Sequence, residues 1–211
     1  MKSRAPQGIP VDNASEMLRR IHLLRERTET VDDRLAAIEV QLSAGVEDFD
    51  YRYDGGGYIY DGGGGLDLPA GRELTDLPAA LVRLYAETDG ATFGRVELSR
   101  AADFRAVTAV DSLGESAYDG PLLEIGDCLE NKIFLDTDTG AVFVYDDLYF
   151  KWGLATGFLL ECADVAEFVA TVALGPRYTE LLGTTNVDET WWRTDAWYHY
   201  LAELGLCPPV R

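Results

Sequence analysis

Apolar positions in the first quarter of the chain follow a helical spacing. Between residues 16 and 43 the seam positions are separated alternately by four and three residues, which is a heptad pattern. The seam consists of Met17, Ile21, Leu24, Thr28, Val31, Leu35, Ile38 and Leu42. This pattern predicts one long amphipathic helix over 16–43. Its apolar seam can pair with a helix outside the domain, either in a coiled-coil homodimer through residues 17–42 or on a partner's helix, or it can pack on the chain's own domain. The sequence leaves both alternatives open.

The segments on either side of this helix have no such pattern. Residues 1–15 contain two prolines and a glycine, which predicts a disordered leader. In 44–73, the stretch Tyr53–Gly65 has seven glycines among thirteen residues. Glycine leaves high backbone entropy, so we expect a flexible linker that lets the N-terminal helix move relative to the rest. A phosphate-binding loop is disfavoured because no apolar strand precedes the glycines and no Lys-Ser or Lys-Thr follows them.

The region 74–211 reads as one domain with several helices. The first is expected to have Asp76 as its N-cap, Pro78 in its first turn and a buried apolar face. That face is Leu77, Leu81, Leu84 and Tyr85. A short helix is expected over Ala101–Val110, followed by a polar connection over Ser112–Gly120.

Two further helices are predicted near the C-terminus. One begins at Asp164, with Glu167 as its capping-box partner, and ends at Gly175-Pro176. Its inward face is Val165, Phe168, Val169 and Val172. The tail from Asp188 to Leu206 predicts a final helix rich in aromatic residues, which can act as a lid on the core or as a recognition surface. These aromatic residues are Trp191, Trp192, Trp197, Tyr198 and Tyr200.

Strand signals lie between these helices. Alternating apolar residues predict a hairpin over 131–147, with Asp136–Gly140 as its turn. A shorter strand is expected at Arg95–Leu98, an apolar run follows at Pro121–Gly126, and Tyr149–Trp152 is a candidate for a further strand. The sequence therefore predicts an α+β fold in which a small mixed or antiparallel sheet is flanked by helices.

The charge of the chain restricts its partners. It has 18 Lys and Arg against 37 Asp and Glu, a net charge of −19. Such a chain repels nucleic-acid phosphates and anionic lipid surfaces, and it attracts a basic protein. No apolar run approaches the ~20 residues that cross a bilayer. We therefore expect no nucleic-acid or membrane partner.

Residues capable of catalysis are few. There are two histidines: His22 lies at a b position of the heptad, outside the apolar seam, where a solvated role is expected, and His199 lies in the aromatic run Trp197–Tyr200, where a packed role is expected. Cys128, Cys162 and Cys207 form no CxxC pair, which indicates free thiols in a reducing cytoplasm. The run from Asp136 to Asp147 resembles a calcium loop only faintly, because Gly140 and Ala141 stand where an acid and a glycine belong. No catalytic, cofactor-binding or metal-binding residue is predicted.

The order of elements from Leu77 to Asp147 resembles the SUKH superfamily, which includes a yeast cell-wall-synthesis regulator and many bacterial toxin-immunity proteins. The resemblance covers about residues 74–174 and rests on five degenerate motifs. They are the Leu77-Pro78 helix, the Asp89-Gly90-Ala91 turn, the apolar run ending at Gly126, the acidic-ended hairpin and the late helix carrying Phe168. The N-terminal helix, the glycine-rich segment and the aromatic tail fall outside it.

This resemblance implies an α+β domain that binds other proteins and catalyses nothing. The expected function is that of an intracellular immunity-type protein whose acidic surface neutralises a basic toxin, such as a nuclease or deaminase. The alternative is a regulatory or scaffold protein that self-associates through its N-terminal helix.

Overall fold

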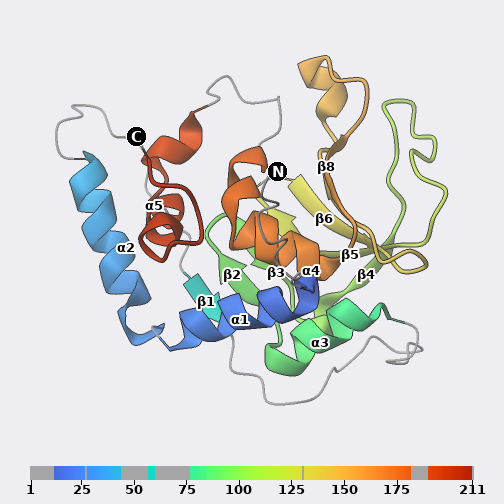
Figure 1. Cartoon of the computed structure of the whole chain (residues 1–211). Helices are drawn as coiled ribbons and strands as arrows, with labels where there is room; N and C mark the ends of the chain where they lie inside the picture. The colour runs from blue at the N-terminus through green and yellow to red at the C-terminus, as the bar shows by residue number, and fades with distance from the viewer. Residues whose placement is uncertain are drawn as a thin grey trace, which may run out of the picture.

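The computed structural model describes residues 12–26, 28–43, 57–59, 77–129, 131–181 and 190–210 (Figure 1). The α-helices are α1 (Asn13–Arg25), α2 (Thr28–Ser43), α3 (Ala79–Glu87), α4 (Val165–Glu167) and α5 (Ala196–Glu203). The strands are β1 (Gly57–Ile59), β2 (Ala91–Phe93), β3 (Val96–Leu98), β4 (Arg105–Val107), β5 (Leu122–Cys128), β6 (Asn131–Asp136), β7 (Val142–Tyr145) and β8 (Phe158–Cys162). Tighter or wider helical turns are η2 (Ala101–Asp103), η3 (Tyr149–Trp152), η4 (Phe168–Ala173), η5 (Pro176–Glu180) and η6 (Trp191–Thr194).

The strands of the described residues form one antiparallel sheet in the order β1-β2-β3-β5-β6-β7-β8. β5 is longer than the strands beside it, and two strands, β3 and β4, pair with the same edge of it. β3 pairs with its second half, where Val96 lies opposite Cys128, and β4 pairs with its first half, where Val107 lies opposite Leu122. The predicted α+β fold is therefore confirmed, with the antiparallel form of the sheet.

The predicted hairpin is also confirmed. β6 and β7 pair with Ile133 opposite Val144 and Leu135 opposite Val142. Gly140 ends the turn with a φ of +84°, a conformation that glycine adopts without the steric cost of a side chain. Because strand side chains alternate, these four apolar residues all face the same side of the sheet.

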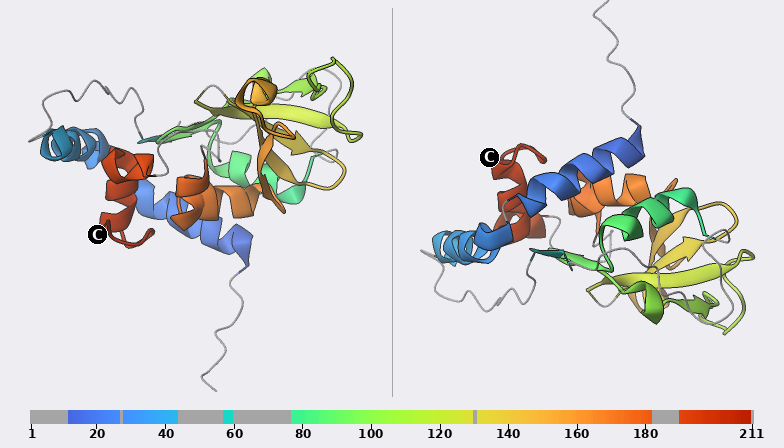
Figure 2. Two further views of the ribbon diagram at one scale, coloured as in Figure 1. Left: turned by 90° about the horizontal axis from the view of Figure 1, so that it is seen from above. Right: turned by 90° about the horizontal axis from the view of Figure 1, so that it is seen from below.

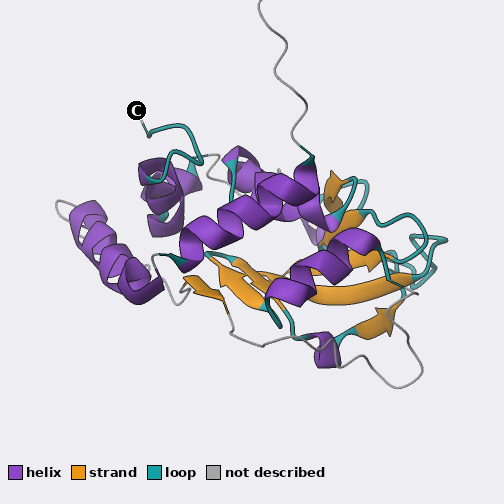
Figure 3. Cartoon of the chain, turned by 60° about the horizontal axis from the view of Figure 1, so that its bottom comes forward, coloured by secondary structure: helices purple, strands orange, loops and turns teal. Residues whose placement is uncertain are grey.

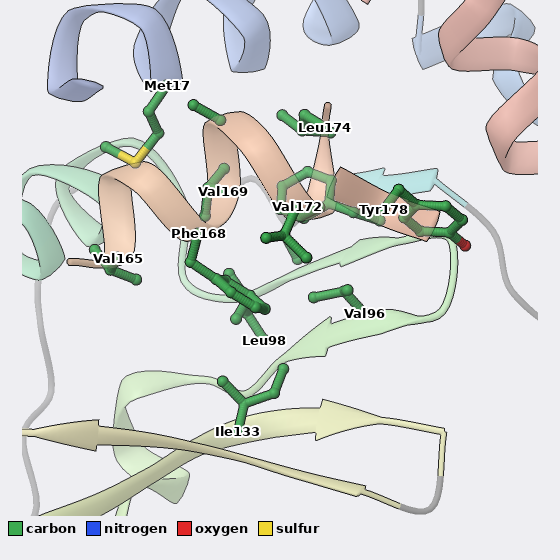
Figure 4. Packing of buried hydrophobic residues seen from close by; sticks show 14 of the residues in the cluster. Met17, Val96, Leu98, Ile133, Val165, Phe168, Val169, Val172, Leu174 and Tyr178 are labelled. Carbon is green, nitrogen blue, oxygen red and sulfur yellow. The ribbon is translucent and has the colours of Figure 1, made fainter. Parts of the chain in front are cut away.

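The helices cover that side of the sheet in two layers (Figures 2 and 3). α3, α4 and η4 lie next to the strands, and α1 packs on the outer side of α4 and η4. Figure 4 shows Phe168 of η4 directed toward Leu98 and Ile133, with Met17 of α1 above the helix. All four side chains are buried, so this interior forms the main core.

The heptad seam is part of this core. Met17, Ile21, Leu24, Val31, Leu35 and Ile38 are each at most 4% exposed. The single predicted helix over 16–43 is wrong, since α1 ends at Arg25 and α2 begins at Thr28. The break lets one half of the seam pack on α4 and η4 while the other half packs near α5. Of the two alternatives, packing on the chain's own domain is the one the structure has.

Arginines of α1 fasten the helix to the ends of two others. Arg25 donates to the main-chain oxygen of Glu87, the last residue of α3. Arg20 donates to the carbonyl of Leu174, the residue that follows η4, at 2.6 Å. A cation at a helix C-terminus satisfies carbonyls that have no partner within the helix. α1 is thus held on the domain by these charged hydrogen bonds as well as by burial. That this helix moves relative to the domain, as the glycine-rich linker suggested, stays a prediction.

The predicted linker over 44–73 contains a regular element. Residues Gly57–Ile59 form β1, which pairs antiparallel with β2, Ile59 lying opposite Ala91. The expectation of no regular structure there was wrong at these three residues, because the sheet edge offers backbone partners that override a weak local preference. The rest of the segment lies outside the described residues, as do the predicted leader up to residue 11 and the predicted N-cap Asp76.

Two other predicted elements differ from the structure. The helix expected over Ala101–Val110 is the short turn η2 followed by strand β4, because this segment pairs with β5. The strand expected over Tyr149–Trp152 is the turn η3, and the true edge strand, β8, follows it. In both places tertiary pairing determined the backbone where local propensity was weak.

The C-terminal helices form as predicted at their starts and differ further along. Asp164 accepts a hydrogen bond from the Glu167 N–H at 2.7 Å, as a capping residue does. From Phe168 onward the helix widens into the π-form η4, which ends before Gly175 and Pro176. The expected final helix is divided into η6 and α5, with Asp195 as the N-cap of α5.

The aromatic tail belongs to the core. Trp197 is fully buried, and its indole N–H donates to the carbonyl of Ala173 at the end of η4, at 3.1 Å. Tyr198 and Tyr200 are also buried. The tail therefore acts as the lid that was one of its two expected roles.

Candidate functional site

Each of the two histidines contacts a group other than a cysteine thiol. His22 is an exposed residue of α1 beside Glu87, and the His199 ring lies 2.8 Å from the carbonyl of Arg193. Burial raises the pKa of each thiol, Cys128, Cys162 and Cys207, to about 12. The charged neighbours that further shift these thiol pKa values are arginines and carboxylates, not histidines. A thiolate nucleophile activated by histidine has no basis in this arrangement.

The hairpin turn that faintly resembles a calcium loop uses its carboxylate internally. Asp136 accepts hydrogen bonds from the N–H groups of Asp138 and Thr139 and from the Tyr118 hydroxyl at 2.5 Å. These bonds stabilise the charged form. They outweigh burial, which would raise the pKa, and the pKa of Asp136 is lowered. Within the described residues, no group of three His, Cys, Asp or Glu side chains is arranged to hold a metal.

A projecting loop between β4 and β5 is the most distinctive surface feature. Residues 109–117, which we call the finger, fold back on themselves as a miniature hairpin. Val110 bridges Ser116, and the Ala117 N–H donates to the Ala109 carbonyl at 2.8 Å. The finger lies on the side of the sheet away from α1, α3 and α4 (Figure 2).

The tip of the finger is held by a single carboxylate. Asp111 Oδ1 accepts from the N–H of Leu113 at 2.8 Å and of Glu115 at 2.9 Å. The Asp111 N–H in turn donates to the Glu115 carbonyl at 2.8 Å, and the Gly114 N–H donates to the Asp111 carbonyl at 3.0 Å. This local network is typical of Asx turns, and it fixes the backbone on both sides of Leu113.

Two tyrosines, one at the end of β7 and one in the β7–β8 connection, fix the finger to this part of the chain. The Tyr145 hydroxyl donates to the Val110 carbonyl at 2.6 Å, and the Tyr149 hydroxyl accepts from the Ser112 N–H at 3.3 Å. Tyr149 belongs to residues 146–153, which we call the η3 turn. The finger and the η3 turn are consequently neighbours, although about 30 residues separate them in sequence.

An aromatic layer lies beneath the finger. Phe134, Phe143, Tyr145 and Phe158 line this side of the sheet with ring centroids 4.9–5.4 Å apart. Tyr118 lies over them from the base of the finger, 5.2 Å from Phe143. The layer is a second, smaller core, and it gives the finger a rigid base.

Apolar side chains are exposed on both loops. Leu113 at the finger tip is 81% exposed and Phe150 on the η3 turn is 46% exposed. Val110 and Leu148 flank them at 42% and 37%. Apart from Leu129 on the β5–β6 turn, these four are the exposed large hydrophobic residues of the described chain, so they mark one region of its surface.

The two loops that carry these apolar side chains are mainly acidic. Residues 108–120 contain Asp111, Glu115 and Asp119 and neither lysine nor arginine, while the η3 turn adds Asp146 and Asp147 against Lys151. Burial raises the pKa of the Tyr145 hydroxyl most, and the neighbouring Tyr149, Asp147 and Asp111 raise it further. An apolar centre with a charged rim is the composition of protein-binding surfaces.

The sequence indicated this site only in part. Residues 112–120 read as a polar connection, and Leu113 was its only large aliphatic side chain. Its exposure depends on Tyr145 and Tyr149 holding the finger across the sheet, a contact that no local pattern encodes.

Comparisons with models of protein families, with curated proteins and with solved structures find no match. The resemblance to the SUKH superfamily therefore stays a prediction. No helix within the described ranges combines the length and apolar character that crossing a membrane requires.

Proposed function

We propose that this chain is a non-catalytic protein-binding module of the cytoplasm that captures a basic protein on the finger and the η3 turn. The observation that carries the proposal is the group of exposed apolar side chains led by Leu113 and Phe150 within an acidic rim. Exposed apolar groups contribute little to the stability of their own chain, but they supply much of the affinity of interfaces.

The partner that best fits this surface is a nucleic-acid-directed toxin. A nuclease or a nucleic-acid deaminase presents a basic surface, so the net charge of −19 would accelerate its capture. Steered association of oppositely charged proteins reaches ~10⁸–10⁹ M⁻¹s⁻¹ at low salt. An immunity-type role, as the SUKH resemblance implies, is consistent with this.

The alternative role, a regulator or scaffold that dimerises through α1 and α2, has less support. Its apolar seam is buried within the chain's own core, and a second copy could reach it only after the core had opened. The surface proposed here needs no such rearrangement.

A tagged pull-down from the native cell lysate, at low and moderate salt and read by mass spectrometry, tests the proposal. One basic protein recovered stoichiometrically and released as salt rises is expected. That protein is then purified, and its association rate is measured against ionic strength. Recovery of the chain alone, or of a partner indifferent to salt, contradicts the proposal.

Matched charge reversals sharpen this test. Glu115→Lys with Asp147→Lys changes the rim, whereas Glu26→Lys with Asp33→Lys makes the same charge change on two exposed residues, the C-cap of α1 and a residue of α2. The rim variant is expected to associate about 10-fold more slowly than the control variant, because local charge steers the encounter. Equal rates for the two variants would place the binding surface elsewhere.

A further inference from the structure

The finger exposes one apolar side chain on an ordered backbone. Leu113 is 81% exposed, yet the N–H groups of Ser112, Leu113, Gly114 and Glu115 all have hydrogen-bond acceptors. Ordering a loop costs conformational entropy, and the Leu113 side chain returns almost no buried area to its own chain. The tip is therefore already in a fixed conformation before anything binds.

A fixed exposed side chain is suited to act as an anchor. Binding to a preformed loop avoids the free-energy cost of ordering it, so more of the contact energy appears as affinity. Phe150 lies on the neighbouring η3 turn, joined to the finger by the bond between Tyr149 and Ser112, and supplies a second apolar contact.

The charges around the tip determine what it can enter. Asp111, Glu115 and Asp119 are the only charged residues of the loop 108–120, so a lipid surface, a nucleic acid or a second copy of this acidic chain would be repelled. The complementary surface is a protein pocket that is apolar at its base and lined with lysine or arginine at its mouth.

We infer that Leu113 is the specificity anchor of this chain and inserts into an apolar pocket of a protein partner, where Glu115 and Asp147 pair with basic residues at the mouth. The inference rests on the proposed function and adds to it the residue that enters the partner and the chemistry of the pocket that receives it.

Selection from a phage-displayed library of random peptides on the immobilised full chain tests this inference. Three forms are compared: wild type, Leu113→Asn and Leu129→Asn. Leu129 is a matched control because it is also an exposed leucine but lies on the β5–β6 turn, outside both loops. Unfolding midpoints of the two variants verify that each is folded, as is expected for substitutions at exposed positions.

Peptides that carry an apolar residue flanked by lysine or arginine are expected from wild type. They should bind Leu129→Asn as tightly as wild type and Leu113→Asn about 10-fold or more weakly, the loss typical of an interface anchor. Three outcomes would overturn the anchor. The selected peptides could bind Leu113→Asn with the same affinity as wild type, they could lack basic residues, or no peptide could be selected at all.

The same variants separate this inference from the proposed function. If a salt-sensitive basic partner from the lysate binds wild type and Leu113→Asn equally, the binding function stands and the anchor fails. If wild type retains no basic protein, the proposed function itself fails, whatever the peptides show.

Discussion

Arg95 and Asp195, which lie 100 residues apart in sequence, form an ion pair with 2.7 Å between Nε and Oδ2. The carboxylate is fully buried and the guanidinium is 10% exposed. Arg95 also lies over the Trp191 ring, 4.8 Å from its centroid. This contact joins the β2–β3 turn to the start of α5, so the first hairpin of the sheet and the C-terminal lid depend on each other.

Replacing Arg95 with leucine is expected to destabilise the protein by about 3–5 kcal/mol, because it leaves a buried carboxylate without its cation. Burial already raises the pKa of Asp195, and Arg95 opposes this shift. A raised carboxyl pKa stabilises the fold at acid pH, and this contribution is lost as pH rises. The destabilisation by Arg95→Leu should therefore be largest at neutral pH and smaller at acid pH. Urea unfolding at several pH values measures it.

The control for this prediction is Arg19→Leu, which removes an arginine from an exposed pair with Glu16. Exposed pairs contribute about 0–1 kcal/mol, so this variant should unfold almost as wild type does. If both variants lose the same free energy of unfolding, the burial of the Arg95–Asp195 pair does not add to its contribution to stability.

Gly94 lies in the turn beside Arg95 and cannot accept a side chain. Its φ is +63°, and a Cβ there would lie 2.5 Å from the Trp197 ring and from the Tyr178 hydroxyl. Gly94→Ala should cost about 2–5 kcal/mol, through backbone strain together with the clash. Gly114→Ala is the matched control, because its φ is +80° and no atom lies within 4 Å, so only strain of about 1–2 kcal/mol remains. The difference in stability between the two variants, measured by thermal unfolding, gives the contribution of the clash. Equal losses of stability would argue against a clash at Gly94.

The buried heptad seam predicts how substitutions in the first two helices act. Ile21→Ala and Leu35→Ala should each lower the free energy of unfolding by about 2–5 kcal/mol, because each leaves a cavity in the core. Changing the half-buried Leu23, which lies beside the seam, to alanine should lower the free energy of unfolding by less. The unfolding midpoint is expected not to depend on protein concentration. A midpoint that rises with concentration would show that two chains share the seam.

The bond between Tyr118 and Asp136 predicts an acid-dependent stability. The pKa of Asp136 is lowered, so its contribution is present above the unfolded value of about 3.9 and is lost as pH falls through the folded-state pKa. In Tyr118→Phe the Asp136 pKa should rise, and the stability difference from wild type should be largest at neutral pH and narrow in acid. Carboxyl carbon NMR titration measures the pKa. Tyr149→Phe, which removes the η3-turn hydroxyl that accepts from the Ser112 N–H, should leave it unchanged. An Asp136 pKa that is the same in wild type and Tyr118→Phe would contradict this account.

The sequence by itself determined the local elements whose signals are strong over a few residues. The β6–β7 hairpin follows from alternating apolar residues and a glycine that can adopt positive φ. The start of the helix at Asp164 follows from its capping side chain. The buried face of α3 follows from the spacing of Leu81, Leu84 and Tyr85. In these cases neighbouring residues supply most of the free energy that selects the conformation.

Only the tertiary structure decided the partner of each apolar surface and the position of the finger. The spacing of the seam is compatible with a coiled coil or with the chain's own core, because burial is favourable against any apolar partner and has no direction. β4 and β8 exist because neighbouring strands supply hydrogen-bond partners to segments of weak propensity. The finger is fixed by bonds from Tyr145 and Tyr149 to a loop distant in sequence. Such contacts join residues that are close in space but far apart in sequence, so no local sequence pattern predicts them.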